Sequence, residues 1–397
     1  MGLMKRSCHF LIFSLFVICS CLIHAQEVVD EKEKVALTQT QIKGLLVVQL
    51  DGGEFAGAAS QMNATSVEKE GAFEIGFNQE VGEMMEKATV EVDKFIRVRY
   101  ENKLPEGTRI EFSFADKYSP KDGPSAAVVC ALMADSILSG DEIDSGFAAT
   151  GDMTATGEVQ PVGGVPSKIK GAIRKGCSHV AIPQQNRQSI ADVYILKGIK
   201  SLYQIQVFTI ESFDQAQALA MSEKPEDVQK ALDEFVLIQG VLKKNEKLIF
   251  NNKVKQKLLN VVKLAPNHLS AKLLYRHSVK RGPKKLSLIG SLTGIDNAGE
   301  KLSSMLDDGS FLTSGGLDGD SLTDLVYDIS RLRPYLDKRT TKYADSYLKV
   351  SAFIKRYRDR KVFTDQLRRE LRQLANNINI ERKRLVNNEE VQSELIE

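Results

Sequence analysis

The sequence predicts an α+β domain followed by a mostly helical region, and three observations support this division. Strand and helix patterns alternate from about residue 42 to residue 222, strand patterns fade beyond Glu223, and 397 residues suffice for two domains. Hydrophobic residues make up 42% of the chain and charged residues 27%, which is typical of soluble globular proteins and excludes collagen-like and wholly disordered chains. The formal net charge of +2 excludes a protein held to polyanions by bulk charge.

Residues 1–25 have the pattern of a secretory signal peptide. Lys5 and Arg6 form a basic start, an apolar run extends from Phe10 to Ile23, and Ala25 offers a cleavage site. We therefore expect a bacterial protein that is exported to the periplasm or the extracellular space.

Two alternatives for this N-terminal segment stay open. The stretch Ile18-Cys19-Ser20-Cys21 resembles a lipobox, in which Cys21 would carry a lipid anchor. The apolar run is also only slightly shorter than the roughly 20 residues of a membrane span, so an uncleaved anchor is the second alternative. In each case the polar residues 26–41 are predicted to be a tether.

The elements of the first domain, residues 42–222, follow from hydrophobic periodicity. Alternating or continuous apolar runs predict strands, and apolar residues three and four apart predict helices. The pattern predicts, in chain order, a strand at 44–50, a helix at 80–102, a strand at 107–115, an apolar helix at 126–140, a strand, a turn and a second strand within 146–164, a helix at 166–176, strands at 178–183 and 203–210, and a helix at 211–221.

The second half of the chain is predicted to be helical. Residues 223–285 contain helical segments at 225–243, 251–264 and 268–281, and the last two resemble a tetratricopeptide-type hairpin without a second copy at that family's period. Residues 286–321 are rich in Gly, Ser and Asp and are predicted to be a loop. The acidic run at 318–324 lacks the glycine and the closing glutamate of an EF-hand, so it is predicted to be part of this loop and not a calcium-binding site.

Residues 322–397 are predicted to be charged helices. Their basic stretches could attract an acidic protein partner or a membrane surface, and the alternative is a solvated helical face. We expect no nucleic-acid partner for an exported protein. Of the five cysteines, only Cys130 and Cys177 lie beyond the signal segment, and in an oxidising compartment a bridge between them is allowed but not implied.

Ser125 is the first candidate for chemistry. It follows Gly123-Pro124 at the predicted start of an apolar helix, and proline suits the first position of a helix. Free backbone N–H groups and the helix dipole would stabilise an oxyanion that forms beside its hydroxyl. The alternative is that Ser125 merely caps the helix.

Lys168 is the candidate base, because no histidine of the mature chain lies in a triad context. Pro166 predicts a helix start just before it, so the helix dipole and apolar neighbours such as Ile169 would favour the neutral amine. Lowering a lysine pKa from about 10.4 to about 7.5 requires roughly 4 kcal/mol, which implies near-complete burial. The alternative is a solvated helix lysine like Lys170.

Three segments together strengthen this assignment: SPKDGPSAAVV, ATGDMTATGEVQPVGGVPSKI and GAIRKGCSHVAIPQQN. They closely resemble the proteolytic domain of Lon-type Ser–Lys peptidases, and the likeness extends over about residues 42–215. The spacing from serine to lysine also matches that family. The resemblance implies an α+β Lon-type proteolytic domain in which Ser125 is the nucleophile and Lys168 the general base.

The same resemblance implies supporting residues. Thr150 matches the family threonine that supports the lysine, Asp122 matches the motif aspartate or caps a helix, and Asp152 replaces a glutamate after Thr-Gly. The departures are Ala127 in place of a glycine, Pro166 before the lysine, and SFADKYS in place of the His-x-Pro-Glu-Gly stretch. None of them removes Ser125 or Lys168.

The implied function is an exported, ATP-independent serine endopeptidase that hydrolyses unfolded or flexible polypeptides. The sequence contains no G-x-x-x-x-G-K-[ST] motif, and no cofactor or metal is expected. The family forms rings, so a homo-oligomer is expected by resemblance, and the helical C-terminal half is expected to recruit a protein partner. The alternative is a catalytically inactive Lon-like module that binds peptides or acts as a scaffold.

Overall fold

The computed structural model describes residues 36–49, 55–101, 103–115, 122–308, 319–357, 364–389 and 391–392. The expected signal peptide, the lipobox alternative at Cys21 and most of the tether lie outside these ranges. Among the helices described, none combines the length and the apolar character that a membrane crossing requires.

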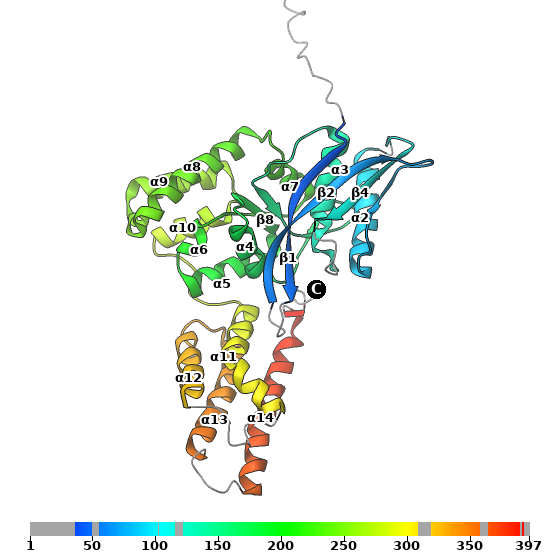
Figure 1. Ribbon diagram of the computed structural model, residues 1–397. Coiled ribbons are helices and arrows are strands. Elements are labelled where there is room, and N and C mark those ends of the chain that lie inside the picture. Colours follow the sequence, from blue (N-terminus) through cyan, green and yellow to red (C-terminus); the bar gives the residue numbers. More distant parts are fainter. Residues whose placement is uncertain are drawn as a thin grey trace, which may run out of the picture. The chain divides into compact units, whose positions relative to one another are not determined.

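A seven-stranded mixed sheet in the order β3-β4-β2-β1-β5-β8-β9 organises the first part of the chain (Figure 1). The pairs β1–β2 and β2–β4 are antiparallel, and the remaining neighbours are parallel. A separate ribbon pairs β6 with β7. The strands are β1 Gln39–Gln49, β2 Phe55–Glu68, β3 Glu74–Phe77, β4 Thr108–Phe114, β5 Phe147–Ala149, β6 Asp152–Met153, β7 Val159–Gln160, β8 His179–Pro183 and β9 Gln206–Ile210.

Helices interleave with these strands, so the α+β prediction is confirmed. Helices α3 and α4 pack on β1 and β2, α2 and α7 pack on α3, and α5 packs on α4 and α6. Their bounds are α2 Glu83–Arg99, α3 Ala127–Ser139, α4 Val165–Arg174, α5 Arg187–Lys197, α6 Lys200–Tyr203 and α7 Phe213–Ala220.

Strand β2 is the main element of this domain that the sequence patterns do not predict. Its residues, FAGAASQMNATSVE, are mostly small or polar and give no clear alternation. It is a strand because β1 and β4 provide hydrogen-bonding partners along both of its edges. The same pairing begins β1 at Gln39, opposite Thr65, so the expected tether 26–41 ends three residues earlier than predicted.

The hydrophobic core around the sheet continues into the first helices of the second half. One cluster of buried residues extends from Ile42 to Leu274 and includes apolar side chains of α8 Glu226–Lys244, α9 Asn252–Leu264 and α10 Leu269–Ser278. Helix α10 packs on β9, where Phe208 and His268 form a β-bridge. These helices match the predicted segments to within a few residues, and they are built onto the sheet.

A second hydrophobic cluster extends from Leu286 to Val391. It is formed by the helices α11 Leu288–Asp308, α12 Gly319–Leu332, α13 Thr341–Tyr357 and α14 Asp365–Val386. Helix α11 contradicts the loop predicted for 286–321. Its residues Leu288, Leu292, Ile295 and Leu302 have helical spacing and are buried, and this burial outweighs the weak helix propensity of the glycines and serines between them.

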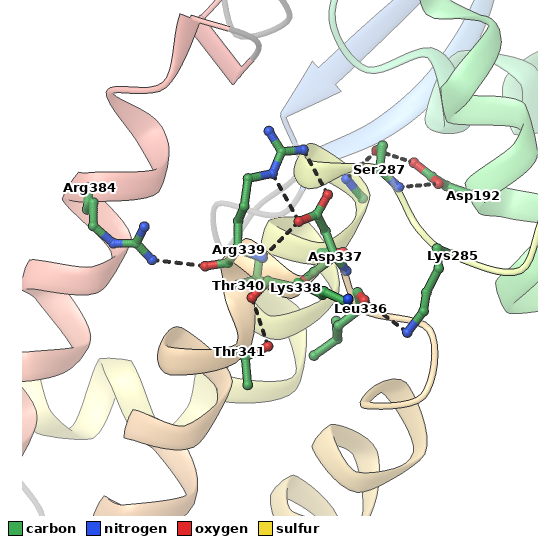
Figure 2. Close-up of polar contacts among 12 residues, drawn as sticks. Asp192, Lys285, Ser287, Leu336, Asp337, Lys338, Arg339, Thr340, Thr341 and Arg384 are labelled. Carbon is green, nitrogen blue, oxygen red and sulfur yellow. Dashed lines mark hydrogen bonds and ion pairs between the residues drawn. The ribbon is translucent and has the colours of Figure 1, made fainter.

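Helix α5 of the first domain forms hydrogen bonds with Ser287, just before α11 begins (Figure 2). The Asp192 carboxylate of α5 is 5% exposed and accepts hydrogen bonds from the backbone N–H of Ser287 at 2.9 Å and from its hydroxyl at 2.5 Å. Lys285 donates to the carbonyl of Pro334 at 2.7 Å, which holds the same segment to the end of α12.

Candidate active site

Ser125 lies in a short 3₁₀ turn, Pro124–Ala126, that leads directly into α3. Gly123 precedes this turn with φ 104°, a backbone conformation that residues with a Cβ atom rarely adopt. Ser125 is 8% exposed, and the predicted position of the serine at a helix start is confirmed.

The backbone carbonyl of Ser125 is held by the segment after β5. Thr150, which is fully buried, donates its hydroxyl to this carbonyl at 3.2 Å, and the N–H of Gly151 donates to it at 2.9 Å. The carbonyl of Gly151 in turn accepts from the N–H of Val128 at 3.2 Å. The structure thus brings Thr150 to Ser125 and fixes the turn on which the serine hydroxyl is carried.

Lys168 lies in the first turn of α4, as predicted. Its backbone N–H donates to the carbonyl of Gly164 at 3.0 Å, and its side chain is among the largest fully buried ones, with 1% of the residue exposed. The alternative of a solvated helix lysine is therefore wrong. Burial of an amine penalises its charged form, which is the form that cannot accept a proton.

Helix α4 approaches β2 very closely at Gly57. A Cβ atom at this position would lie 1.7 Å from the carbonyl oxygen of Ser167, the residue before Lys168. Only glycine permits this contact, and it explains why small residues occupy this part of β2. Both the turn that carries Ser125 and the helix that carries Lys168 pack on β1.

Asp122 caps a helix, although a different one from the helix that follows it in the sequence. Its carboxylate accepts hydrogen bonds from the N–H groups of Met84 at 3.1 Å and Met85 at 3.2 Å, in the first turn of α2, and from Gly123 at 2.7 Å. Carboxylates at this end of a helix are stabilised by the free N–H groups and the dipole. Asp122 therefore anchors the serine turn to α2.

Asp152 lies at the start of β6, two residues after Thr150. Burial raises the pKa of its carboxyl above the ordinary value, the hydrogen bond from the N–H of Met153 opposes this shift, and the charge of Glu91 adds to it. Glu91 accepts from the N–H of Ala155 at 3.1 Å, so α2 holds the turn between β6 and β7.

Asn186 is a buried polar residue that the sequence analysis did not single out. It lies directly before α5, is 1% exposed, and forms two hydrogen bonds with the backbone of Val162, in the segment that leads to α4. A lone asparagine after a strand carries no sequence signal for such a contact, because the partner is 24 residues away.

The two cysteines of the described chain are unpaired. Cys130 is 2% exposed in α3 and Cys177 is 7% exposed before β8, and burial raises the pKa of both thiols. In the ranges that the structure covers, no group of three or more His, Cys, Asp or Glu side chains is arranged to hold a metal ion.

Comparison with known proteins identifies the first half of the chain. Residues 23–223 match the family model of the Lon protease (S16) C-terminal proteolytic domain. The chain is 30% identical over 188 residues to Lon protease 2 of Borreliella burgdorferi, which covers 45% of this chain and 23% of that protein. It is 36% identical over 121 residues to Lon protease 2 of Sorangium cellulosum, covering 28% of this chain and 15% of that protein.

The match is confined to part of these relatives. A third relative, the Lon protease of Desulforamulus reducens, is 30% identical over 149 residues, which cover 36% of this chain and 18% of that protein. The chain thus spans at most about a quarter of the length of these curated relatives. The residues matched by the family model contain Ser125, Thr150 and Lys168.

Proposed function

The chain belongs to the Lon protease C-terminal proteolytic domain family, and we propose that it is a serine endopeptidase with Ser125 as nucleophile and Lys168 as general base. The observation that carries the proposal is the complete burial of the Lys168 side chain in a domain of this family. A lysine is seldom buried without a role, because removing an ammonium group from water is costly.

The proposed reaction is acyl transfer. The neutral amine of Lys168 takes the proton of the Ser125 hydroxyl while Oγ attacks the carbonyl carbon of a peptide bond. The tetrahedral intermediate collapses as the amine nitrogen of the leaving group receives that proton from Lys168. A water molecule, deprotonated by the same lysine, then hydrolyses the acyl-enzyme and releases Ser125.

Two backbone N–H groups that follow Ser125 have partners within the protein. The N–H of Ala127 donates to the carbonyl of Pro124, and the N–H of Val128 donates to Gly151. We propose the N–H groups of Ser125 and Ala126, at the start of a helix, as the oxyanion donors, because preorganised donors stabilise the developing charge. Thr150 contributes by holding the Ser125 carbonyl, which sets the direction of these groups.

The wider proposal concerns energy, location and assembly. The printed sequence has no nucleotide-binding G-x-x-x-x-G-K-[ST] motif, so we propose that cleavage needs no ATP and that substrates are unfolded or flexible polypeptides. The basic N-terminal start and apolar run support export. A ring-shaped homo-oligomer and a protein partner of the helical C-terminal half complete the proposal.

The test is labelling and cleavage by the purified mature protein. A serine-reactive acyl probe should modify the native chain at Ser125, and an unfolded protein substrate should be cleaved at a rate that is unchanged by added ATP. Ser125→Ala should abolish both labelling and cleavage. A native chain that binds unfolded polypeptide but neither reacts with the probe nor cleaves would instead be the inactive peptide-binding or scaffold module.

A further inference from the structure

Asn186 pairs with the backbone of Val162 in the way that one strand pairs with another. Its side-chain Oδ1 accepts from the N–H of Val162 at 3.0 Å, and its Nδ2 donates to the carbonyl of Val162 at 2.8 Å. Both residues are buried, with 1% and 2% exposed. The side-chain amide therefore satisfies both polar groups of one buried peptide residue, which would otherwise cost free energy.

Val162 lies in the short segment that connects β7 to α4. The following residues include Gly163 and Gly164, and Gly164 has φ 64° and supplies the carbonyl that accepts from the N–H of Lys168 at 3.0 Å. Glycines permit many backbone conformations, so this segment needs an external constraint to adopt one. Asn186 provides that constraint at Val162, before α4 begins, and the close approach of Gly57 to Ser167 constrains the first turn of α4 itself.

We propose that Asn186 is a positioning residue for Lys168, an inference that rests on the proposed peptidase function. Asn186 does not itself touch the reacting atoms in this proposal. It holds the start of α4 so that the Lys168 amine lies within reach of the Ser125 hydroxyl. A displacement of about 1 Å in a reacting group can lower the rate by about 100-fold. Loss of the hydrogen bonds between Asn186 and Val162 should therefore lower the rate of the chemical step.

The first test compares Asn186→Ala with Gln239→Ala. Gln239 is a matched control, because it is also a buried amide, 8% exposed, that donates to a backbone carbonyl, that of Tyr203 at 3.0 Å, but it lies in α8. Asn186→Ala should lower kcat by about 100-fold with KM changed by less than about 2-fold. Gln239→Ala should lower the melting temperature and leave kcat within about 2-fold of the native value.

The second test uses the isosteric Asn186→Asp. The aspartate keeps an acceptor for the Val162 N–H, but once ionised it places a second oxygen against the Val162 carbonyl and no longer donates. Native cleavage should increase with pH, because the proposed base must be unprotonated, whereas Asn186→Asp should lose activity once its carboxyl ionises. A purely structural role would lower the amplitude of the pH profile without reversing its direction.

A third readout separates this inference from the proposed function. In the Ser125→Ala background, which has no activity, hydrogen exchange of the amides from Val162 to Lys170 should be faster in Asn186→Ala than in Gln239→Ala. Unlabelled and inactive native protein would overturn the peptidase function and with it the role of Asn186. Three results in an active native protein would overturn the positioning role alone. They are equal losses of kcat in Asn186→Ala and Gln239→Ala, an activity of Asn186→Asp that still increases with pH, or equal rates of hydrogen exchange in the two alanine variants.

Discussion

The two hydrophobic clusters of this protein bury different kinds of polar side chain. Among the described residues, the first cluster surrounds carboxylates, a lysine, two histidines and buried amides, and its fully buried members include Lys168, Asn186 and His268. Within the second cluster's own range, 286–391, the buried polar side chains of the described residues all carry hydroxyl groups. There the Ser346 hydroxyl donates to the carbonyl of Tyr343 at 2.6 Å and the Thr340 hydroxyl to that of Asp337 at 2.8 Å, within their own local backbone.

The two clusters therefore differ in the free energy that is required to bury their polar side chains. Hydroxyls bonded to nearby carbonyls are inexpensive to bury, whereas charged or titratable groups are expensive unless partners compensate for the lost water. In the second cluster the arginine Arg382 keeps its side chain 51% exposed while it binds Asp296 at 3.0 Å. Costly burial is therefore concentrated in the cluster that holds the proposed active site, as is typical of functional sites.

The strongest test of this contrast replaces one basic side chain in each cluster by methionine. Lys168→Met should reduce acylation by the serine-reactive probe by about 1,000-fold or more, because no base remains to activate Ser125. The variant should remain folded, because an apolar chain of similar length fills the same buried volume. Probe labelling and urea denaturation measure the two effects.

Arg382→Met is the matched control in the second cluster. It should lower the free energy of unfolding by about 1 kcal/mol, because Asp296 loses a partly solvated ion pair, and leave acylation unchanged. Acylation by Lys168→Met at the native rate would show that this lysine is buried for stability and not for chemistry.

The second test adds one methyl group to a glycine. Gly57→Ala should destabilise the protein by about 3 kcal/mol, because the new Cβ would lie 1.7 Å from the Ser167 carbonyl and force α4 away from β2. Gly240→Ala, at an exposed position of α8 with open space around it, should instead stabilise by up to about 1 kcal/mol through helix propensity. Equal effects of the two substitutions in urea denaturation would contradict the close approach of α4.

The third test is a difference in acid sensitivity. Burial lowers the pKa of His268 to about 3 and also lowers the pKa of His179, with backbone hydrogen bonds opposing both shifts. The unfolded chain binds these protons near pH 6.5 and the folded chain does not. Stability should therefore decrease as pH falls from about 6.5 toward 3, by up to about 1.4 kcal/mol per pH unit for each histidine.

This acid effect should be confined to the first cluster, since no histidine follows His277 in the sequence. Hydrogen exchange at pH 7 and pH 5, corrected for the intrinsic rates, should show weaker protection of β8 and α10 at the lower pH, with α13 unaltered. His268→Gln should reduce the loss. A uniform loss of protection in both clusters would assign the acid sensitivity to other groups.

Local patterns predicted most of the helices and the positions of the main candidates. Apolar periodicity placed α2, α3 and α8 to within a few residues, and the prolines before Ser125 and Lys168 marked two element starts correctly. They did not predict β3 or α5, and they were wrong for β2 and α11. Neither has a strong local preference, and each forms because distant residues cover it, β1 and β4 in one case and the second hydrophobic cluster in the other.

The α+β class, the helical second half and the family motif that contains Ser125 and Lys168 can be predicted from the amino-acid sequence alone. The burial of Lys168, the capping of α2 by Asp122 and the hydrogen bonds of Asn186 to Val162 are visible only in the folded protein. The physical reason is the range of the interactions. Periodicity and helix starts depend on residues within a turn or two, whereas burial and capping by a distant side chain depend on elements that meet only after the chain has folded.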